Sequence, residues 1–253
     1  MIPKTIHYCW LSNDPIPESL QTYMQSWRRY LPDFEFILWD FNRFDKSKSL
    51  WVQEAFERKK YAFAADYIRL YAVYNYGGFY LDMDVEIVKS LKDFLDLKTA
   101  ICWQDRYDGF EAACFGAEKG SPWLKTCLDY YQNRHFIINN KKMELKPLPN
   151  IMEDTLKQNG YIIENAYSIE DVLNTESERT FKVLPSDYFS PKSVQTGIIS
   201  QTNQTYSIHH FAGSWVNPYD NLPLYAKIWR FLHLPNTNIR EKIFRLKNKN
   251  NYK

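Results

Sequence analysis

The sequence predicts a single α/β domain with a mostly parallel central sheet flanked by helices. Strand patterns alternate with helical spacing through the first third of the chain, and this alternation is typical of a parallel sheet covered on both faces. The 253 residues suffice for one large domain, and 45% of them are hydrophobic, which is enough for a core. We find no internal repeat or linker.

The first half of the chain carries the more regular patterns. The spacing of its apolar residues predicts strands at 2–10, 34–39 and 79–88, and helices at 18–30, 49–59 and 61–76. The last of these helices is rich in alanine and other helix formers. It is stopped by Gly77 and Gly78, because glycine readily ends a helix.

The second half is less regular. Its patterns predict strands at 101–103, 112–117, 181–184 and 206–211, and helices at 121–134, 150–160 and 225–232. Ser121 and Pro122 form a good N-cap and first-turn pair for the first of these helices. We expect residues 1–235 to form the domain and residues 236–253 to be a basic tail.

Charge and cysteine usage limit the classes of protein. A formal net charge of +2 argues against a dedicated nucleic-acid binder, which is usually much more basic. The four cysteines form no zinc-ligand spacing, so free thiols in a reducing compartment are the simplest account. There is no signal-peptide pattern, and no apolar run approaches the roughly 20 residues that span a bilayer. We therefore expect a cytoplasmic protein.

Two features of the composition leave alternatives open. Residues 240–253 hold six Lys and Arg against one acid, with apolar residues among them. This segment fits either a frayed soluble terminus or peripheral contact with the inner face of an anionic membrane. The aromatic content of 17% fits either an aromatic core or rings that stack on sugars and bases.

Asp82 and Asp84 stand one residue apart, behind a glycine pair and Tyr80. A chain of this length holds about one such tripeptide by chance, so the context decides. On the predicted strand 79–88 both carboxylates point to one face about 7 Å apart, close enough to share a divalent ion. Oxygen ligands favour Mg²⁺ or Mn²⁺ over zinc. The alternative is a solvated acidic face of a surface strand.

Two further segments can complete such a site. Asp66 and Arg69 stand three residues apart on one helix face. They form either a surface ion pair or a pair that binds hydroxyl groups of a sugar or ribose. The stretch IHHFAGSW, residues 208–215, can supply His209 or His210 as a neutral imidazole ligand, although lone histidines are more often structural.

Taken together, these segments resemble glycosyltransferase family 32. This family includes bacterial capsular and lipopolysaccharide sugar transferases, yeast mannosyltransferases and the catalytic domains of clostridial glucosylating toxins. The resemblance spans roughly residues 2 to 217 and is carried by IPKTIHYCWL with SWRRYLPDFEFILWD, AFAADYIRLYAVYNYGGFYLDMDV, FGAEKGSPWLKTCLDYY and SIHHFAGSW.

The resemblance implies a GT-A fold with the Asp-x-Asp motif at the end of a strand, a nucleotide-sugar donor, a divalent cation (usually Mn²⁺) and transfer with retention at the anomeric carbon. By position, Trp10 resembles the aromatic residue that stacks on the donor base. Asp66 and Arg69 resemble residues that bind the ribose and sugar of the donor, and Tyr80 resembles the tyrosine beside the nucleotide.

The same resemblance implies the metal ligands. Asp84 is similar to the direct ligand, and Asp82 to the carboxylate that reaches both the metal and the donor hydroxyls. With Arg69, these two aspartates are the expected catalytic residues. His210 is the expected third ligand, from the wider GT-A pattern of histidine followed by Phe-x-Gly, and His209 is the weaker candidate. Ser214 and Trp215 resemble the pair that closes over the diphosphate.

We therefore expect a retaining, metal-dependent transferase that moves a hexose to a glycan or glycolipid acceptor during surface polysaccharide or lipopolysaccharide synthesis, at the inner face of the cytoplasmic membrane. UDP-hexose is the preferred donor and GDP-mannose the competitor. One alternative is a metal-dependent phosphohydrolase, which usually needs more acidic or histidine ligands than are clustered here. The other is an aromatic-rich carbohydrate-binding module, which leaves the acidic strand without a purpose.

Overall fold

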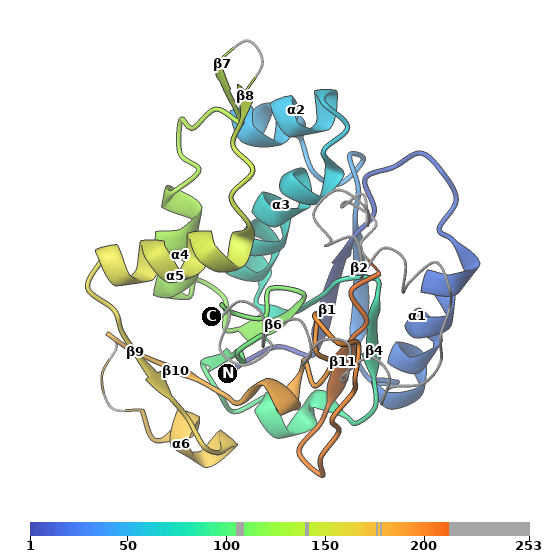
Figure 1. The fold of residues 1–253 in the computed structure, drawn as a ribbon, viewed down its shortest axis with the longest axis vertical. Coiled ribbons are helices and arrows are strands. Elements are labelled where there is room, and N and C mark those ends of the chain that lie inside the picture. The colour runs from blue at the N-terminus through green and yellow to red at the C-terminus, as the bar shows by residue number, and fades with distance from the viewer. Residues whose placement is uncertain (105–108, 140–141, 176, 178, 213–253) are drawn as a thin grey trace, which may run out of the picture.

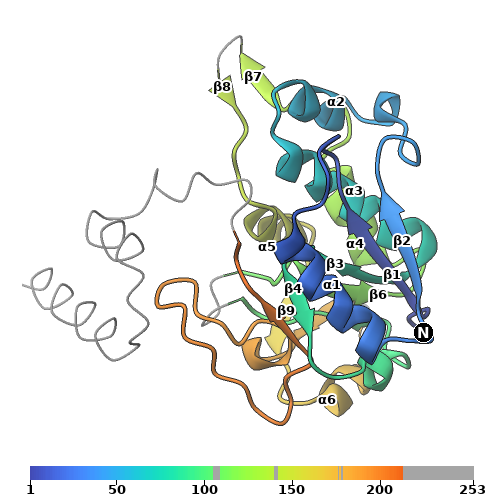
Figure 2. The same cartoon turned by 90° about the vertical axis from the view of Figure 1, so that its right-hand side faces the viewer.

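The computed structural model describes residues 1–104, 109–139, 142–175, 177 and 179–212. Within them, a central sheet lies between layers of helices (Figures 1 and 2). The predicted helix at 225–232, the basic tail, Ser214 and Trp215 lie outside the described residues. None of the described helices is long and apolar enough to cross a membrane.

The central sheet has five strands in the order β2-β1-β3-β6-β5. Their bounds are β1 Thr5–Cys9, β2 Glu35–Trp39, β3 Gly78–Leu81, β5 Thr99–Ala100 and β6 Cys114–Ala117. β1 is parallel to both β2 and β3, whereas β6 is antiparallel to both β3 and β5. Four of the five strands therefore run in one direction, which confirms the predicted layout of a mostly parallel sheet flanked by helices.

Helices cover the sheet on both sides because successive residues of each strand bury their side chains on opposite faces. The helices are α1 Glu18–Tyr30, α2 Leu50–Glu57, α3 Tyr61–Tyr76, α4 Pro122–Asp129, α5 Leu148–Gln158 and α6 Ile169–Leu173. On β3, Tyr80 packs into the core formed with α2 to α5, whereas Phe79 and Leu81 pack into the core shared with α1. The four cysteines are buried free thiols, as predicted.

The remaining strands form two-stranded ribbons. They are β4 Val85–Ile87 with β11 Ser207–His209, β7 Ile137–Asn139 with β8 Lys142–Met143, and β9 Ile162–Asn165 with β10 Thr180–Val183. Short 3₁₀ turns lie at Lys46–Lys48, Leu91–Phe94 and Ser186–Tyr188. The predicted strand 101–103 contributes only isolated bridges, at Cys102 and Trp103.

The prediction of one continuous strand over 79–88 is wrong. The chain forms β3, turns at Asp82 to Asp84, and continues as β4. The Val85 N–H closes this turn by donating to Asp82 O at 3.0 Å. The break occurs because the two halves pair with different partners: β3 joins the central sheet, whereas β4 pairs with β11.

The helix α3 has the predicted bounds, and two glycines turn it into β3. Gly77 has φ of 69° and Gly78 has φ of 104°, a region that side chains with a Cβ rarely adopt. A Cβ at Gly78 would lie 2.5 Å from Thr5 O on β1. Glycine therefore allows β3 to pair closely with β1 immediately after the helix.

The buried side chain of His7 links this turn to β2. Its Nε2 donates to Gly77 O at 2.8 Å, so its Nδ1 is free to accept from Trp39 Nε1–H at 3.1 Å. Burial lowers the pKa of His7 to about 4, against about 6.5 for an unperturbed histidine. The ring is therefore neutral in the folded protein near pH 7.

His7 should make the protein less stable in mild acid. The unfolded chain binds the His7 proton below pH ~6.5, whereas the folded protein resists it down to pH ~4, so stability falls as the pH drops through this window. We expect this residue to remove about 2 kcal/mol of unfolding free energy between pH 7 and pH 5. Urea titrations of the native protein and His7→Gln, which does not titrate, measure this difference, and identical pH dependence would contradict it.

Candidate metal centre

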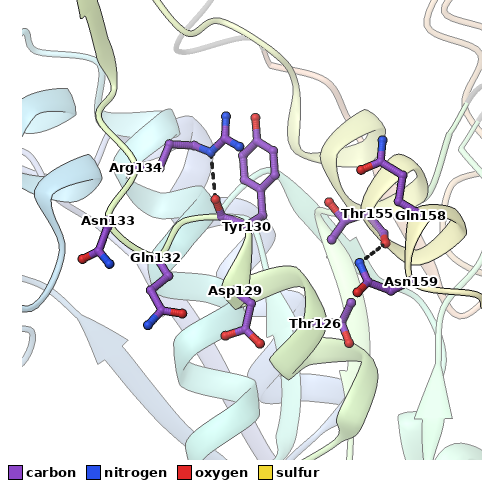
Figure 3. A pocket seen from close by; sticks show the side chains of 9 residues that line it. All are labelled: Thr126, Asp129, Tyr130, Gln132, Asn133, Arg134, Thr155, Gln158 and Asn159. Carbon is purple, nitrogen blue, oxygen red and sulfur yellow. Dashed lines mark hydrogen bonds between the residues drawn. The ribbon is translucent and has the colours of Figure 1, made fainter.

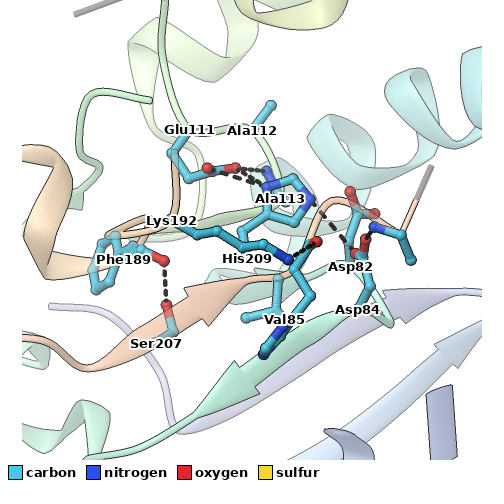
Figure 4. Close-up of polar contacts among 12 residues, drawn as sticks. Asp82, Asp84, Val85, Glu111, Ala112, Ala113, Phe189, Lys192, Ser207 and His209 are labelled. Carbon is cyan, nitrogen blue, oxygen red and sulfur yellow. Dashed lines mark hydrogen bonds and ion pairs between the residues drawn. The ribbon is translucent and has the colours of Figure 1, made fainter. Parts of the chain in front are cut away.

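The acidic turn lies at the carboxyl end of β3, where the chain leaves the central sheet. Asp82 follows β3 directly, and its N–H donates to Ala113 O at 2.8 Å. Asp84 precedes β4, and Met83 is buried between the two aspartates. The hydrogen bond to Ala113 thus holds the turn in place. The carboxylates of Asp82 and Asp84 lie near each other (Figure 4).

His209 completes a group of three potential metal ligands. One ligand atom from each of Asp82, Asp84 and His209 lies within 4.8 Å of the others. His209 Nε2 is 3.6 Å from Asp84 Oδ1. Two carboxylates and one imidazole form a donor set that suits a divalent ion such as Mn²⁺ or Mg²⁺, so these residues fit the metal that the family resemblance implies.

The structure corrects the expected choice of histidine. His210 was the preferred ligand, yet its Nε2 lies 2.8 Å from Glu86 Oε2 and its ring stacks on Tyr23 with centroids 4.3 Å apart. His209 ends strand β11, and consecutive residues of an extended chain point to opposite sides. Because β11 places His209 opposite Val85, the imidazole of His209 is the one beside the aspartates.

Asp84 is anchored by the segment that follows β11. Its Oδ2 accepts from the Ala212 N–H at 2.7 Å, and its backbone O accepts from the His210 N–H at 2.9 Å. Burial alone would raise the pKa of Asp84, but the contacts with His209 and Ala212 hold that pKa below its usual value. Asp84 is therefore a charged carboxylate at neutral pH.

Glu111 contacts the other side of the His209 ring and was not singled out from the sequence. Its carboxylate is fully buried and lies 3.2 Å from His209 Nδ1 (Figure 4). Burial alone would lower the pKa of His209, but Glu111 and Asp84 raise it to about 10. A cation that binds through Nε2 must therefore displace a proton, as is usual for histidine ligands.

Arg69 lies behind Asp82 and pairs with two aspartates. Its Nη1 donates to Asp82 Oδ2 at 3.1 Å and to Ala112 O at 2.8 Å, and its Nη2 is 3.3 Å from Asp66 Oδ1. Asp66 and Arg69 are only 8% and 6% exposed, so the alternative of a surface ion pair is wrong. Asp66 and Arg69 thus lie beside the acidic turn, as expected from the sequence.

Tyr80 is also buried, and it supports Asp82. Its hydroxyl donates to Asp82 Oδ1 at 2.8 Å, and the Arg69 guanidinium lies 4.6 Å from its ring centroid. Both Asp82 oxygens thus have a donor, one from Tyr80 and one from Arg69. Tyr80 can therefore influence the candidate metal site by holding the carboxylate of Asp82 in place.

Trp10 lies at the same sheet edge, one residue beyond the end of β1. Because β1 and β3 are parallel neighbours, their carboxyl ends lie side by side. The Trp10 indole N–H donates to Asp14 O at 2.8 Å, which orients the ring within its own loop. The structure thus places Trp10 on the edge that carries the acidic turn, whereas the predicted diphosphate residues Ser214 and Trp215 are outside the described part.

A polar pocket of about 550 Å³ lies elsewhere, between α4 and α5 (Figure 3). Its lining includes one acidic residue, Asp129, and no histidine. The Arg134 Nε–H donates to Tyr130 O at 2.8 Å, and the Asn159 amide donates to Thr155 O at 2.8 Å. Two of its polar side chains are therefore engaged with the protein itself, and we assign the chemistry to the acidic turn.

Comparison with known proteins identifies the region that contains this turn. Residues 17–102 match a family model described as a glycosyltransferase sugar-binding region containing a DXD motif. The chain is 32% identical over 129 residues to inositol phosphoceramide mannosyltransferase 3 of Schizosaccharomyces pombe, covering 49% of this chain and 35% of that protein. It is 36% identical over 99 residues to mannosyl phosphorylinositol ceramide synthase SUR1 of Saccharomyces cerevisiae, covering 38% and 26%.

The aligned parts therefore span well under half the length of these two curated relatives. Among solved structures, the PaToxG glycosyltransferase aligns with a TM-score of 0.45 at 18% identity, covering 62% of this chain and 69% of that chain. The matched region includes Asp66, Arg69, Tyr80 and both aspartates of the acidic turn. Residues 17–102 of this chain are therefore similar to the DXD-bearing sugar-binding region of glycosyltransferases.

Proposed function

We propose that this protein is a metal-dependent glycosyltransferase that moves a hexose from a nucleotide sugar to a glycan or glycolipid acceptor. The observation that carries the proposal is the approach of Asp82, Asp84 and His209 to within 4.8 Å of one another, because two of these residues are the DXD aspartates of the matched region. The group lies at the carboxyl edge of parallel strands, where α/β proteins usually bind ligands.

The chemistry requires that negative charge be stabilised as the sugar leaves the diphosphate. A divalent cation at this site supplies Lewis-acid stabilisation of the phosphate oxygens. Asp84 and His209 would hold the ion, and Asp82 would contact it from a position fixed by Arg69 and Tyr80. Trp10 would stack on the donor base at the same edge. Retention at the anomeric carbon is part of the proposal and rests on the family resemblance.

The names of the relatives bear on the donor and the acceptor. Two matched proteins are named as mannosyltransferase and mannosyl phosphorylinositol ceramide synthase. These names favour a mannosyl donor such as GDP-mannose over the UDP-hexose expected from the sequence. They also favour a glycolipid acceptor over a surface polysaccharide. With such an acceptor, we propose that the protein works at the inner face of a membrane.

Thermal unfolding with a panel of donors tests the function. We expect one UDP-, GDP- or CMP-sugar to stabilise the protein in the presence of Mn²⁺ and to have little effect without it. At a hundredfold excess over the dissociation constant, the stabilisation should be about 2.7 kcal/mol. Mass detection of the sugar released by slow donor hydrolysis then names the donor.

Phosphate esters and free sugars, tested beside the donor panel, separate the alternatives. A phosphohydrolase would release inorganic phosphate from phosphate esters in the presence of Mn²⁺, without sugar transfer. A carbohydrate-binding module would bind free sugar with neither nucleotide nor metal. Either of these results, with no Mn²⁺-dependent donor binding, would contradict the proposed function.

A further inference from the structure

The side chain of Glu111 is fully buried just before strand β6. Its Oε1 accepts from the Ala113 N–H at 2.8 Å, two residues along its own chain. The Glu111 N–H donates to Cys102 O at 2.9 Å. Both the backbone and one carboxylate oxygen are thus fixed by the surrounding protein, so the carboxylate has a defined direction.

The carboxylate of Glu111 faces His209. Both of its oxygens lie 3.2 Å from His209 Nδ1, while His209 Nε2 is 3.6 Å from Asp84 Oδ1 (Figure 4). Neutral imidazole carries one N–H, so an acceptor on Nδ1 places that proton on Nδ1 and leaves the Nε2 lone pair for a cation. Histidine ligands of metals are commonly held in this way by a carboxylate behind the ring.

Support of the local backbone alone does not account for a charged residue here. A neutral side-chain carbonyl would accept from the Ala113 N–H equally well, and an isolated buried carboxylate is costly. His209 Nδ1 is the group that offsets this cost. The placement of Glu111 is therefore explained by its contact with the ring.

We propose that Glu111 is a positioning residue for the cation site, holding His209 in the Nδ1–H form with Nε2 directed at the ion shared with Asp82 and Asp84. This inference rests on the proposed function, because it requires a cation to bind at the acidic turn. Glu111 would not touch the cation itself but would act on it through the imidazole of His209.

Mn²⁺ binding without nucleotide tests the role of Glu111. Glu111→Gln has nearly the same shape, but its amide is neutral and replaces one of the two oxygens beside His209 Nδ1 with a donor NH₂ group. We expect about 10- to 100-fold weaker Mn²⁺ binding, measured by calorimetry and by electron paramagnetic resonance of free Mn²⁺. Glu118→Gln, which removes an exposed pairing with the N-terminus, should leave the affinity unchanged.

A double-mutant cycle separates positioning from a general effect on the fold. In a His209→Ala background, Glu111→Gln should change the Mn²⁺ affinity less than twofold, because the ring through which it acts is gone. An equal loss in both backgrounds, or no loss in the native background, would overturn the inference. If Asp84→Asn also retains full Mn²⁺ affinity, the proposed cation site itself fails. If only Asp84→Asn loses it, the role of Glu111 alone fails.

A measurement on the native chain covers the case in which Glu111→Gln does not fold. Histidine labelled with ¹⁵N reports the state of each ring nitrogen, and His209→Ala identifies the His209 signals. With Cd²⁺, a diamagnetic ion that imidazole binds, we expect a protonated Nδ1 and a metal-bound Nε2. Any other state of the His209 ring at saturating Cd²⁺ would overturn the proposal.

Discussion

Replacing Asp84 with asparagine should abolish Mn²⁺-dependent transfer while leaving the fold intact. The amide has no charge to hold a divalent ion, and the stabilisation that such an ion supplies to a leaving diphosphate amounts to several kcal/mol. A loss of about 4 kcal/mol corresponds to a rate that is lower by about a thousandfold. Turnover of the donor identified by thermal unfolding, with and without Mn²⁺, measures this effect.

The fold should tolerate this change because the neighbouring contacts survive it. The asparagine Oδ1 can still accept from the Ala212 N–H, and the backbone O of residue 84 keeps its bond from the His210 N–H. Circular dichroism and the unfolding midpoint should stay close to those of the native protein. Glu86→Gln is the matched control, because Glu86 pairs with His210 outside the three-ligand group. Mn²⁺-dependent turnover retained by Asp84→Asn would contradict the assignment of Asp84.

Replacing Arg69 with methionine should destabilise the protein by about 3 to 5 kcal/mol. Arg69 pairs with both Asp66 and Asp82, and removing it leaves the buried Asp66 and the partly buried Asp82 without their cation. Breaking a buried pair on one side costs about this much, because the remaining charge has lost both water and partner. Urea unfolding at pH 7.5 measures the change, and Arg58→Met, at an exposed position, is the control.

A second substitution tests the cause of this loss. Burial raises the pKa of Asp66 to about 7 even beside Arg69, so without Arg69 this carboxyl must either stay charged unpaired or take up a proton. In the Arg69→Met background, Asp66→Asn removes that cost and should restore part of the lost stability. If Arg69→Met unfolds at the same urea concentration as the native protein, the ion pairs of Arg69 make no net contribution to the unfolding free energy. If Asp66→Asn lowers the stability further, unpaired charge is not the cause of the loss.

Several elements were predictable because their signals are local. The helix Tyr61–Tyr76 has the predicted bounds, since its helix formers run without interruption to a glycine pair. The helix Glu18–Tyr30 is equally well matched, because apolar periodicity determines which face is buried. The same locality placed Asp66 with Arg69 on one helix face, a spacing that the fold keeps.

The acidic segment shows where local signals end. The pattern of residues 79–88 is that of one strand, yet the chain turns at the two aspartates. The turn exists because β4 leaves the central sheet to pair with β11, which lies far along the chain. The sequence left open whether Asp66 and Arg69 form a surface pair. Both are buried in the structure, where Arg69 contacts Tyr80 on β3 and the Ala112 carbonyl before β6.

The sequence by itself determined the α/β class, the helix that carries Asp66 and Arg69, and the pairing of the two aspartates behind the glycine pair that ends this helix. Only the tertiary structure decided that His209 rather than His210 faces the aspartates, and that Glu111 stands behind its ring. The physical reason is that the register of β11 against β4, and the packing of the chain before β6, are set by contacts between segments distant in sequence. Strand periodicity identifies two faces, but the pairing of the strand decides which face meets the site.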